Sequence, residues 1–242
     1  MRNLNLEYKK PAKLTFKTGN PKTDKNLKLD SKLSKYWILR LNLAPHTLSG
    51  YNTCPSASNG CATACLHTAG NPVFQKQKDS GRINRTRYYM QDRTEFIERL
   101  KKEISNHIKY CKKHDFKPVM RLNTTSDISW ENHGIFEQFP DMMFYDYTKV
   151  KKRALKYVSG GYPSNYHLTF SMNECNQSDA MEILDLGGNV AMVFRKELPA
   201  TYQGYTVIDG DTSDLRFLDA KNCIVGLIAK GKAKKDTSGF VV

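Results

Sequence analysis

Long apolar runs are missing from this sequence. A membrane-spanning helix needs about 18 or more consecutive apolar residues, and every apolar stretch here is shorter and is broken by charged or turn-forming residues. The amino terminus reads MRNLNLEYKKPAKLTF, which is basic but lacks the apolar stretch of a signal peptide. We therefore expect no membrane partner and a protein that stays in the cytoplasm where it is made.

Acidic side chains are scarce. The chain carries 38 Lys and Arg against 24 Asp and Glu, a formal charge of +14, and residues 1–40 hold eleven basic side chains but only three acidic ones. Such a segment is typical of proteins that bind phosphate-bearing partners, although a solvated basic surface has the same composition. We define residues 1–35 as a basic N-terminal arm and expect it to be extended or partly disordered without a partner. We predict a nucleic acid or a nucleotide as that partner.

The cysteine content does not indicate a disulfide framework. Six cysteines occur in 242 residues, and disulfide frameworks belong to small secreted chains, whereas this chain is neither small nor visibly secreted. Cys111, Cys175 and Cys223 each stand alone, in apolar or helical surroundings. We predict that these three are small buried side chains.

Residues 36–242 predict one α/β domain without internal repeats. The expected strands are 35–43, 118–125, 142–148, 166–172, 189–194, 205–210 and 223–229, and the expected helices are 92–114, 130–140, 149–158 and 176–188. The strands are mostly continuous apolar runs, which favours parallel strands covered on both faces. The pattern is close to a full or partial (β/α) barrel of the TIM type, with a doubly wound sheet as the alternative.

The helix expected at 92–114 has the clearest pattern. Phe96, Leu100, Ile104 and Ile108 recur at a spacing of four, which places them on one face. Asp92 precedes them and is the expected N-cap, because a side-chain oxygen there can accept a hydrogen bond from a free N–H group of the first turn.

Polar residues follow the expected strands, where βα folds carry their chemistry. Any one of them has an ordinary explanation, since every strand must end in something polar. Asp127 is suited to a hydroxyl or an amine, and Lys149 or Arg195 to a carboxylate or phosphate. The candidate catalytic residues are Asp127, Lys149 and Asp209, and the candidate ligand-binding residues are Ser126, Asp127, Ser171 and Arg195.

The loop at 50–71 holds half of the cysteines: Cys54, Cys61 and Cys65, followed by His67. Thiolates are soft ligands, and both zinc and an iron–sulfur cluster suit them. A cubane cluster needs ligands that reach different irons of one compact body, and the small residues of this loop leave room for it. Cys54, Cys61, Cys65 and His67 also form a conceivable zinc set, and the third alternative is that the loop binds no metal.

Three blocks carry a resemblance to a known family. NTCPSASNGCATACL, MRLNTTSDISW and FPDMMFYDYTK resemble, in this order, an uncharacterised family of bacteriophage proteins with a three-cysteine Thr-Cys-Pro block. That family is distantly similar to radical-SAM enzymes, which place three cluster cysteines in the loop after the first strand of a partial βα barrel. The cysteines here are separated by six and three residues, whereas radical-SAM enzymes usually have three and two, and Thr125-Ser126-Asp127 stands where those enzymes have a Gly-Gly-Glu-type segment.

The resemblance implies a [4Fe–4S] cluster held by Cys54, Cys61 and Cys65, with S-adenosylmethionine (SAM) as a candidate second ligand. It also implies a protein that acts in the host cytoplasm. The first hypothesis is an enzyme for a nucleotide or nucleic-acid-related substrate. The alternative is a non-catalytic nucleic-acid-binding protein with a structural zinc, in which basic residues of the arm and of 82–87 contact phosphates. The sequence carries no signal for the reaction or for the oligomeric state.

Overall fold

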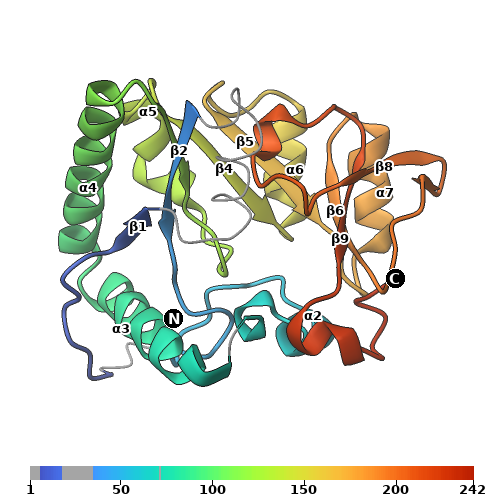
Figure 1. The fold of residues 1–242 in the computed structure, drawn as a ribbon, viewed down its shortest axis with the longest axis horizontal. Helices are drawn as coiled ribbons and strands as arrows, with labels where there is room; N and C mark the ends of the chain where they lie inside the picture. Colours follow the sequence, from blue (N-terminus) through green and yellow to red (C-terminus); the bar gives the residue numbers. More distant parts are fainter. Residues whose placement is uncertain (1–5, 18–34, 71) are drawn as a thin grey trace. The chain divides into compact units, whose positions relative to one another are not determined.

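The computed structural model describes residues 6–17, 35–70 and 72–242. The chain divides into two compact units, and Figure 1 labels their helices and strands. Unit one takes residues 1–55 and 71–144, and unit two takes residues 56–70 and 145–242. The cysteine loop is therefore shared, with Cys54 in unit one and both Cys61 and Cys65 in unit two.

Unit one is an α/β unit with the strand order β1-β2-β3-β4. Strands β2, β3 and β4 run parallel, and β1 pairs antiparallel with β2. Its elements are β1 (Thr15–Lys17), β2 (Tyr36–Leu41), η3 (Pro72–Phe74), α3 (Gln75–Gln91), α4 (Arg93–Lys113), β3 (Lys117–Arg121), η4 (Trp130–His133), α5 (Ile135–Gln138) and the first residues of β4 (Met143–Thr148).

Unit two continues from β4 with the strand order β4-β5-β6-β9-β8-β7. Its described pairs are parallel except for the β7–β8 hairpin. Its elements are α2 (Asn59–Thr63), η2 (Leu66–Thr68), α6 (Lys151–Val158), β5 (Tyr166–Ser171), α7 (Gln177–Asp185), β6 (Val190–Phe194), β7 (Thr201–Tyr202), β8 (Tyr205–Asp209), η5 (Arg216–Leu218), β9 (Ile224–Ile228) and η6 (Gly231–Lys235).

The seven expected strands are all present, but the described strands do not close into a full barrel. A barrel needs its first and last parallel strands to pair with each other. In unit one the outer edge of β2 is occupied by β1, and in unit two the outer edge of β8 is occupied by β7. The order also departs from that of a barrel, because β9 lies between β6 and β8. Among the described residues, the sheet is therefore open in each unit.

Helix α4 confirms the expected helix and covers β2 and β3. Phe96, Leu100 and Ile104 are fully buried on its inner face. The capping prediction is wrong in its chemistry: Asp92 occupies the N-cap position, but its side chain makes no cap hydrogen bond. Its carboxylate instead accepts the hydroxyl of Tyr8, which attaches the N-terminal segment to this helix junction.

The described part of the basic arm is fastened to unit one's helices. The carboxylate of Glu103 in α4 accepts the backbone N–H groups of Leu14 and Thr15, each at 2.9 Å. Arg87 in α3 donates to the main-chain oxygen of Glu7 at 2.7 Å, and Lys10 pairs with Glu95 at 2.5 Å. Residues 6–17 thus have a partner within the chain, which the sequence analysis did not predict. The rest of the arm lies outside the described residues.

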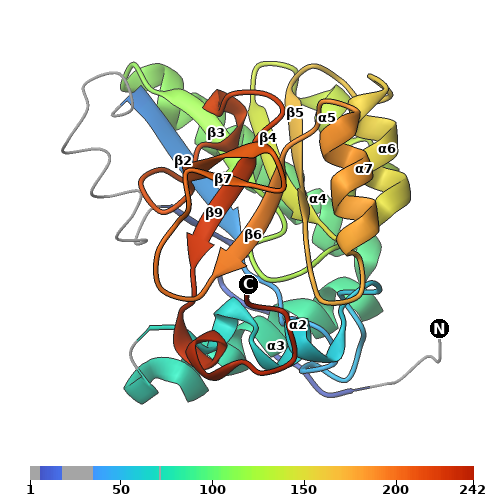
Figure 2. The same ribbon diagram turned by 90° about the vertical axis from the view of Figure 1, so that its right-hand side faces the viewer.

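Helices α6 and α7 form the covering layer of unit two. Figure 2 shows them side by side, and α6 packs against β5 while α7 packs against β5 and β6. Their apolar faces bury Ala154, Ala180, Ile183 and Leu184 against Phe170 and other strand residues. No helix in the described ranges has the length and apolar character needed to cross a membrane.

Candidate functional site

Cys54 is held at the carboxyl ends of β2 and β3 in unit one. Its sulfur accepts the backbone N–H of His46 at 3.3 Å and lies 3.7 Å from the main-chain oxygen of Thr125. The preceding Thr53 donates its hydroxyl to the main-chain oxygen of Ala44 at 2.6 Å, and its own main-chain oxygen accepts the N–H of Asp127 at 2.8 Å. The segment after β3 therefore fixes the backbone next to Cys54.

Asn123 organises that segment. Its side-chain oxygen accepts the Ser126 hydroxyl at 2.9 Å, the Ile128 N–H at 3.0 Å and the Trp130 indole N–H at 3.1 Å. Its amide nitrogen donates to the main-chain oxygen of Ile128 at 2.9 Å. The side chain of Ser126, a candidate ligand-binding residue, is thus engaged in holding the loop. Asn123 and Asp127 are also buried, at 1% and 9% exposure.

Cys61 and Cys65 lie on a short segment that Glu174 anchors in unit two. The Ser58 hydroxyl accepts the Cys61 N–H at 3.1 Å, as the N-cap of α2, and donates to one oxygen of Glu174 at 2.7 Å. The other oxygen of Glu174 accepts the Gly60 N–H at 2.6 Å. Glu174 follows β5, so a strand-end carboxylate fixes the entry to the cysteine helix.

Gly60 allows this close approach. A methyl group at this position would lie 2.6 Å from a Glu174 oxygen and would also overlap Ser238. Behind α2, Ala64 packs with Phe240 and Val241 in an apolar cluster that Cys61 borders. The C-terminal residues therefore support the segment that carries Cys61 and Cys65.

The six cysteines differ in exposure, and none forms a disulfide bond. Cys111 and Cys223 are buried, as predicted, and burial raises the pKa of each thiol to about 11. The prediction was wrong for Cys175, which is exposed because it lies in the turn between β5 and α7. The three loop cysteines are each partly exposed.

Within the described ranges, no three His, Cys, Asp or Glu side chains form a group able to hold a metal ion. Cys54 and the pair Cys61 and Cys65 belong to different units. The metal site and the identity of its metal therefore stay predictions. The donor set itself suits a soft metal, since it offers three thiols outside disulfide bonds on one stretch rich in small residues.

Lys149 and Ser171 are brought together in unit two. The Lys149 ammonium group, just after β4, donates to the Ser171 hydroxyl at the end of β5 over 2.8 Å. The same ammonium group lies 5.8 Å from the centre of the Phe240 ring. These two candidates from neighbouring strand ends form a polar pair, as parallel strands predict.

Arg195 and Asp209 are placed differently. Arg195 donates to the main-chain oxygen of Asp236 at 3.1 Å, next to the C-terminal segment. Asp209 accepts the N–H of Asp211 and the hydroxyl of Thr212, both at 2.7 Å, and these contacts, led by the Thr212 bond, hold its pKa below the usual range. Both contacts of Asp209 organise the turn after β8.

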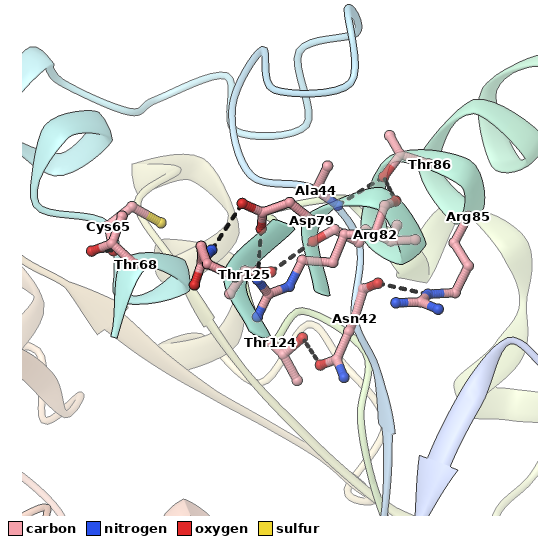
Figure 3. A network of polar contacts seen from close by, with 12 residues as sticks. Asn42, Ala44, Cys65, Thr68, Asp79, Arg82, Arg85, Thr86, Thr124 and Thr125 are labelled. Carbon is pink, nitrogen blue, oxygen red and sulfur yellow. Dashed lines mark hydrogen bonds and ion pairs between the residues drawn. The ribbon is translucent and has the colours of Figure 1, made fainter. Parts of the chain in front are cut away.

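A second polar network surrounds the N-terminal half of α3 in unit one (Figure 3). The guanidinium group of Arg85 donates through Nε to the main-chain oxygen of Asn42 at 2.8 Å, and the Thr124 hydroxyl donates to the Asn42 side chain at 2.6 Å. Arg82 forms an ion pair with Asp79 at 2.9 Å. Helix α3 is thereby joined to the chain that leaves β2.

Sequence reasoning gave Glu174 and Asn42 no role. Glu174 could have been found from its position after β5, but nothing in the sequence pairs it with Ser58, which is 116 residues away. Asn42 follows β2 directly, and its contribution is largely a main-chain oxygen, which any residue type would supply.

The chain matches the sequence model of a protein family described as Gene product 88, over residues 9–242. This agrees with the expected phage protein family, while the likeness to radical-SAM enzymes stays a prediction. No curated protein and no solved structure matches the chain.

Proposed function

Because the chain belongs to the Gene product 88 family, whose description names no activity, we propose a function from its own residues: Cys54, Cys61 and Cys65 bind a [4Fe–4S] cluster in an enzyme that acts on a nucleotide or a nucleic-acid-related substrate. One observation carries the proposal. The three loop thiols stay outside disulfide bonds and partly exposed, while a strand-end loop fixes the backbone beside Cys54 and another fixes that beside Cys61.

The surroundings of the thiols support metal ligation. The N–H of His46 that points at the Cys54 sulfur is the kind of donor that stabilises a thiolate and tunes a bound cluster. The segment from 56 to 64 contains mainly small residues, so bulky side chains do not crowd the thiols. When bound, a cluster with one open iron would supply a site for SAM or for a substrate.

The chain's own polar residues would hold the substrate. Lys149, oriented by its hydrogen bond to Ser171, offers a positive charge for a carboxylate or a phosphate in unit two. In unit one, Asp127 is fixed through its backbone at Thr53 and is the candidate for a hydroxyl or an amine. Arg195 is a further candidate for an anionic group. A role in catalysis has the least support for Asp209, because its carboxylate accepts two hydrogen bonds from the turn after β8.

The test is the iron, sulfide and zinc content of the full chain purified without oxygen, together with its visible spectrum. The proposal expects about four irons per chain and a brown colour. Cys54→Ser, Cys61→Ser and Cys65→Ser should each lose most of the iron. Cys175→Ser is the matched control, because it removes an exposed thiol of unit two that lies outside the loop, and it should keep the iron.

Other results would overturn the proposal. A folded, colourless chain without iron excludes the cluster, and equal iron loss in the Cys175→Ser control shows that the iron is not bound by the loop. If the cluster is present, SAM is the first ligand to titrate, and its binding separates a radical-SAM-like enzyme from another cluster protein.

The alternative is a nucleic-acid-binding protein with a structural zinc, and it has less support. Two of its basic residues are engaged within unit one, since Lys10 pairs with Glu95 and Arg87 donates to main-chain oxygens of Glu7 and Ser49. One tightly held zinc, no colour and salt-dependent binding of nucleic acid would favour this alternative.

A further inference from the structure

Arg85 is the most unusual charged side chain of unit one. It is 93% buried by exposed area, at 7% exposure, on the inner side of α3. Burying a charge without a partner of opposite charge is unfavourable. Within the described ranges, however, no carboxylate lies within ion-pair distance of Arg85. The charge of Glu103 raises the pKa of Arg85, but less than burial and Arg82 lower it.

The guanidinium group keeps most of its hydrogen-bonding capacity. It has five N–H donors, and one of them, on Nε, donates to the main-chain oxygen of Asn42. The two terminal nitrogens have no acceptor among the described residues, yet they are not sealed from solvent. The neighbouring Arg82 does not compete for a ligand of Arg85, because its own charge is paired with Asp79 at 2.9 Å.

The group is also held in place. The ring of Phe16 in β1 lies 4.7 Å from the guanidinium carbon and covers one face of it. Gly81, one turn earlier in α3, lies beside the guanidinium group: a methyl group there would be 3.4 Å from Nη1 and 3.6 Å from Nη2, which is ordinary van der Waals contact.

Removal of Arg85 from water has an electrostatic consequence. Burial, together with the nearby charge of Arg82, lowers its pKa to about 10, which is well above neutral pH. The group therefore remains charged and is poorly solvated. A planar fork of fixed donors in such a site matches the oxygens of a phosphate group, which an arginine can bind through two parallel hydrogen bonds.

We propose that Arg85 is an anion-binding residue that holds a phosphate group of a small ligand at the carboxyl end of β2. Asn42 assists: its main-chain oxygen orients the guanidinium, and its side chain is positioned by the Thr124 hydroxyl (Figure 3). The exposed part of the Phe16 ring, which is 40% exposed, offers apolar surface beside the fork. This site uses no cysteine, and it stands whether or not the chain binds a cluster.

The test is calorimetric titration of the full chain with inorganic pyrophosphate and with adenosine diphosphate, at constant ionic strength. Arg85→Gln should weaken binding of the tighter probe at least about tenfold, as expected for loss of charge-assisted hydrogen bonds. Arg93→Gln is the matched control, since it removes an exposed arginine that also stacks on a ring, that of Tyr89 at 5.0 Å. It should change the affinity less than about twofold.

A second variant covers the case in which Arg85→Gln does not fold. Arg85→Lys keeps the charge but removes the planar fork of donors, and it should weaken binding several-fold. If adenosine diphosphate binds more tightly than pyrophosphate, the source of the phosphate is a nucleotide; equal affinities indicate the phosphate group alone, and both results support the site. The absence of binding by either probe overturns it, as does an equal loss in Arg85→Gln and Arg93→Gln.

Discussion

The two units both use the loop after a parallel strand to hold a part of the cysteine loop, but with different chemistry. In unit one the loop after β3 reaches the cysteine loop through a backbone bond, from the Asp127 N–H to the Thr53 oxygen, beside Cys54. In unit two the loop after β5 reaches it through a carboxylate, that of Glu174, which binds Ser58 and Gly60 beside Cys61.

The attachment in unit one depends on a neutral and buried amide. Four hydrogen bonds of the Asn123 side chain stay within residues 123–130, and they shape the loop before it meets Thr53. Such bonds contribute about 1 kcal/mol each, but a buried group left without its partner costs about 1–3 kcal/mol. The position of Cys54 is therefore tied to the folding of unit one itself.

The attachment in unit two depends on one partly exposed charge. Hydrogen bonds to a charged group contribute about 1.5–3 kcal/mol, and both oxygens of Glu174 are directed at the cysteine segment. The sheet of unit two has its own core around Phe170 and Met192, which does not involve Glu174. The segment with Cys61 can therefore loosen while the sheet remains folded, whereas the segment with Cys54 cannot do so as easily.

Asn123→Ala should have the largest effect on stability. It removes the acceptor of the buried Trp130 indole N–H and of the Ile128 backbone N–H, and we expect a loss of about 3 kcal/mol in the free energy of unfolding. Both tryptophans of the chain, Trp37 and Trp130, lie in unit one, so their fluorescence during urea unfolding reports this unit. Ser126→Ala is the control and should cost about 1 kcal/mol. Equal losses in the two variants would contradict the central role of Asn123.

Glu174→Gln should act locally in unit two. The substitution keeps the size of the side chain but removes its charge and one acceptor, and we expect the segment with Cys61 to open about tenfold more often. The measurement is the alkylation rate of Cys61 relative to Cys54 in metal-free protein, read by mass spectrometry of the peptides. Glu182→Gln, which changes an exposed acid paired with Lys151, is the control. A general rise in the labelling of every cysteine would mean that Glu174 supports the whole unit.

Ser58→Ala should have a smaller effect at the same place. It removes the N-cap contact to the Cys61 N–H and one of the two partners of Glu174. Loss of such a cap costs about 1 kcal/mol, so alkylation of Cys61 should rise less than in Glu174→Gln. Because both residues belong to one chain of contacts, the double variant should differ little from Glu174→Gln alone. Additive effects would show that the two residues act separately.

The elements of the fold were largely predictable, because local patterns determine them. The continuous apolar runs predicted seven strands, and the spacing of Phe96, Leu100 and Ile104 predicted α4. The closure of the sheet was not predictable in this way. It depends on β1 and β7, which are three and two residues long, and elements so short leave no periodic signal in the sequence.

The candidate site was predictable only in its residue types. Lys149 and Ser171 form a hydrogen bond, because neighbouring parallel strands end at one edge. Strand-end position did not indicate that the carboxylate of Asp209 would accept hydrogen bonds from Asp211 and Thr212 in the turn after β8. The buried Arg85 was visible as one of several arginines, but its isolation from carboxylates arises from long-range packing of α3 on Asn42 and Phe16.

The smallest expected effect is of the same size in both units and comes from one histidine in each, of which His107 is buried and His167 is half-buried. His107 donates from Nε2 to the Trp37 main-chain oxygen over 2.9 Å in unit one, and His167 forms a hydrogen bond with the Tyr157 hydroxyl at 2.9 Å in unit two. Burial lowers the pKa of each to about 4, and the charge of Arg216 adds to this for His167.

In the unfolded chain a histidine has a pKa of about 6.5, so between pH 6.5 and 4 the unfolded state binds more protons and stability falls as the pH falls. From pH 7 to pH 6 each histidine should remove roughly 0.7 kcal/mol. Urea unfolding at these two pH values measures the loss of unfolding free energy. The double variant His107→Gln/His167→Gln should abolish the part of this loss that comes from the two histidines, and each single variant should abolish about half of that part. If one variant removes all of it, the two units do not share this property, and the pKa of the histidine in the other unit is not lowered in the folded chain.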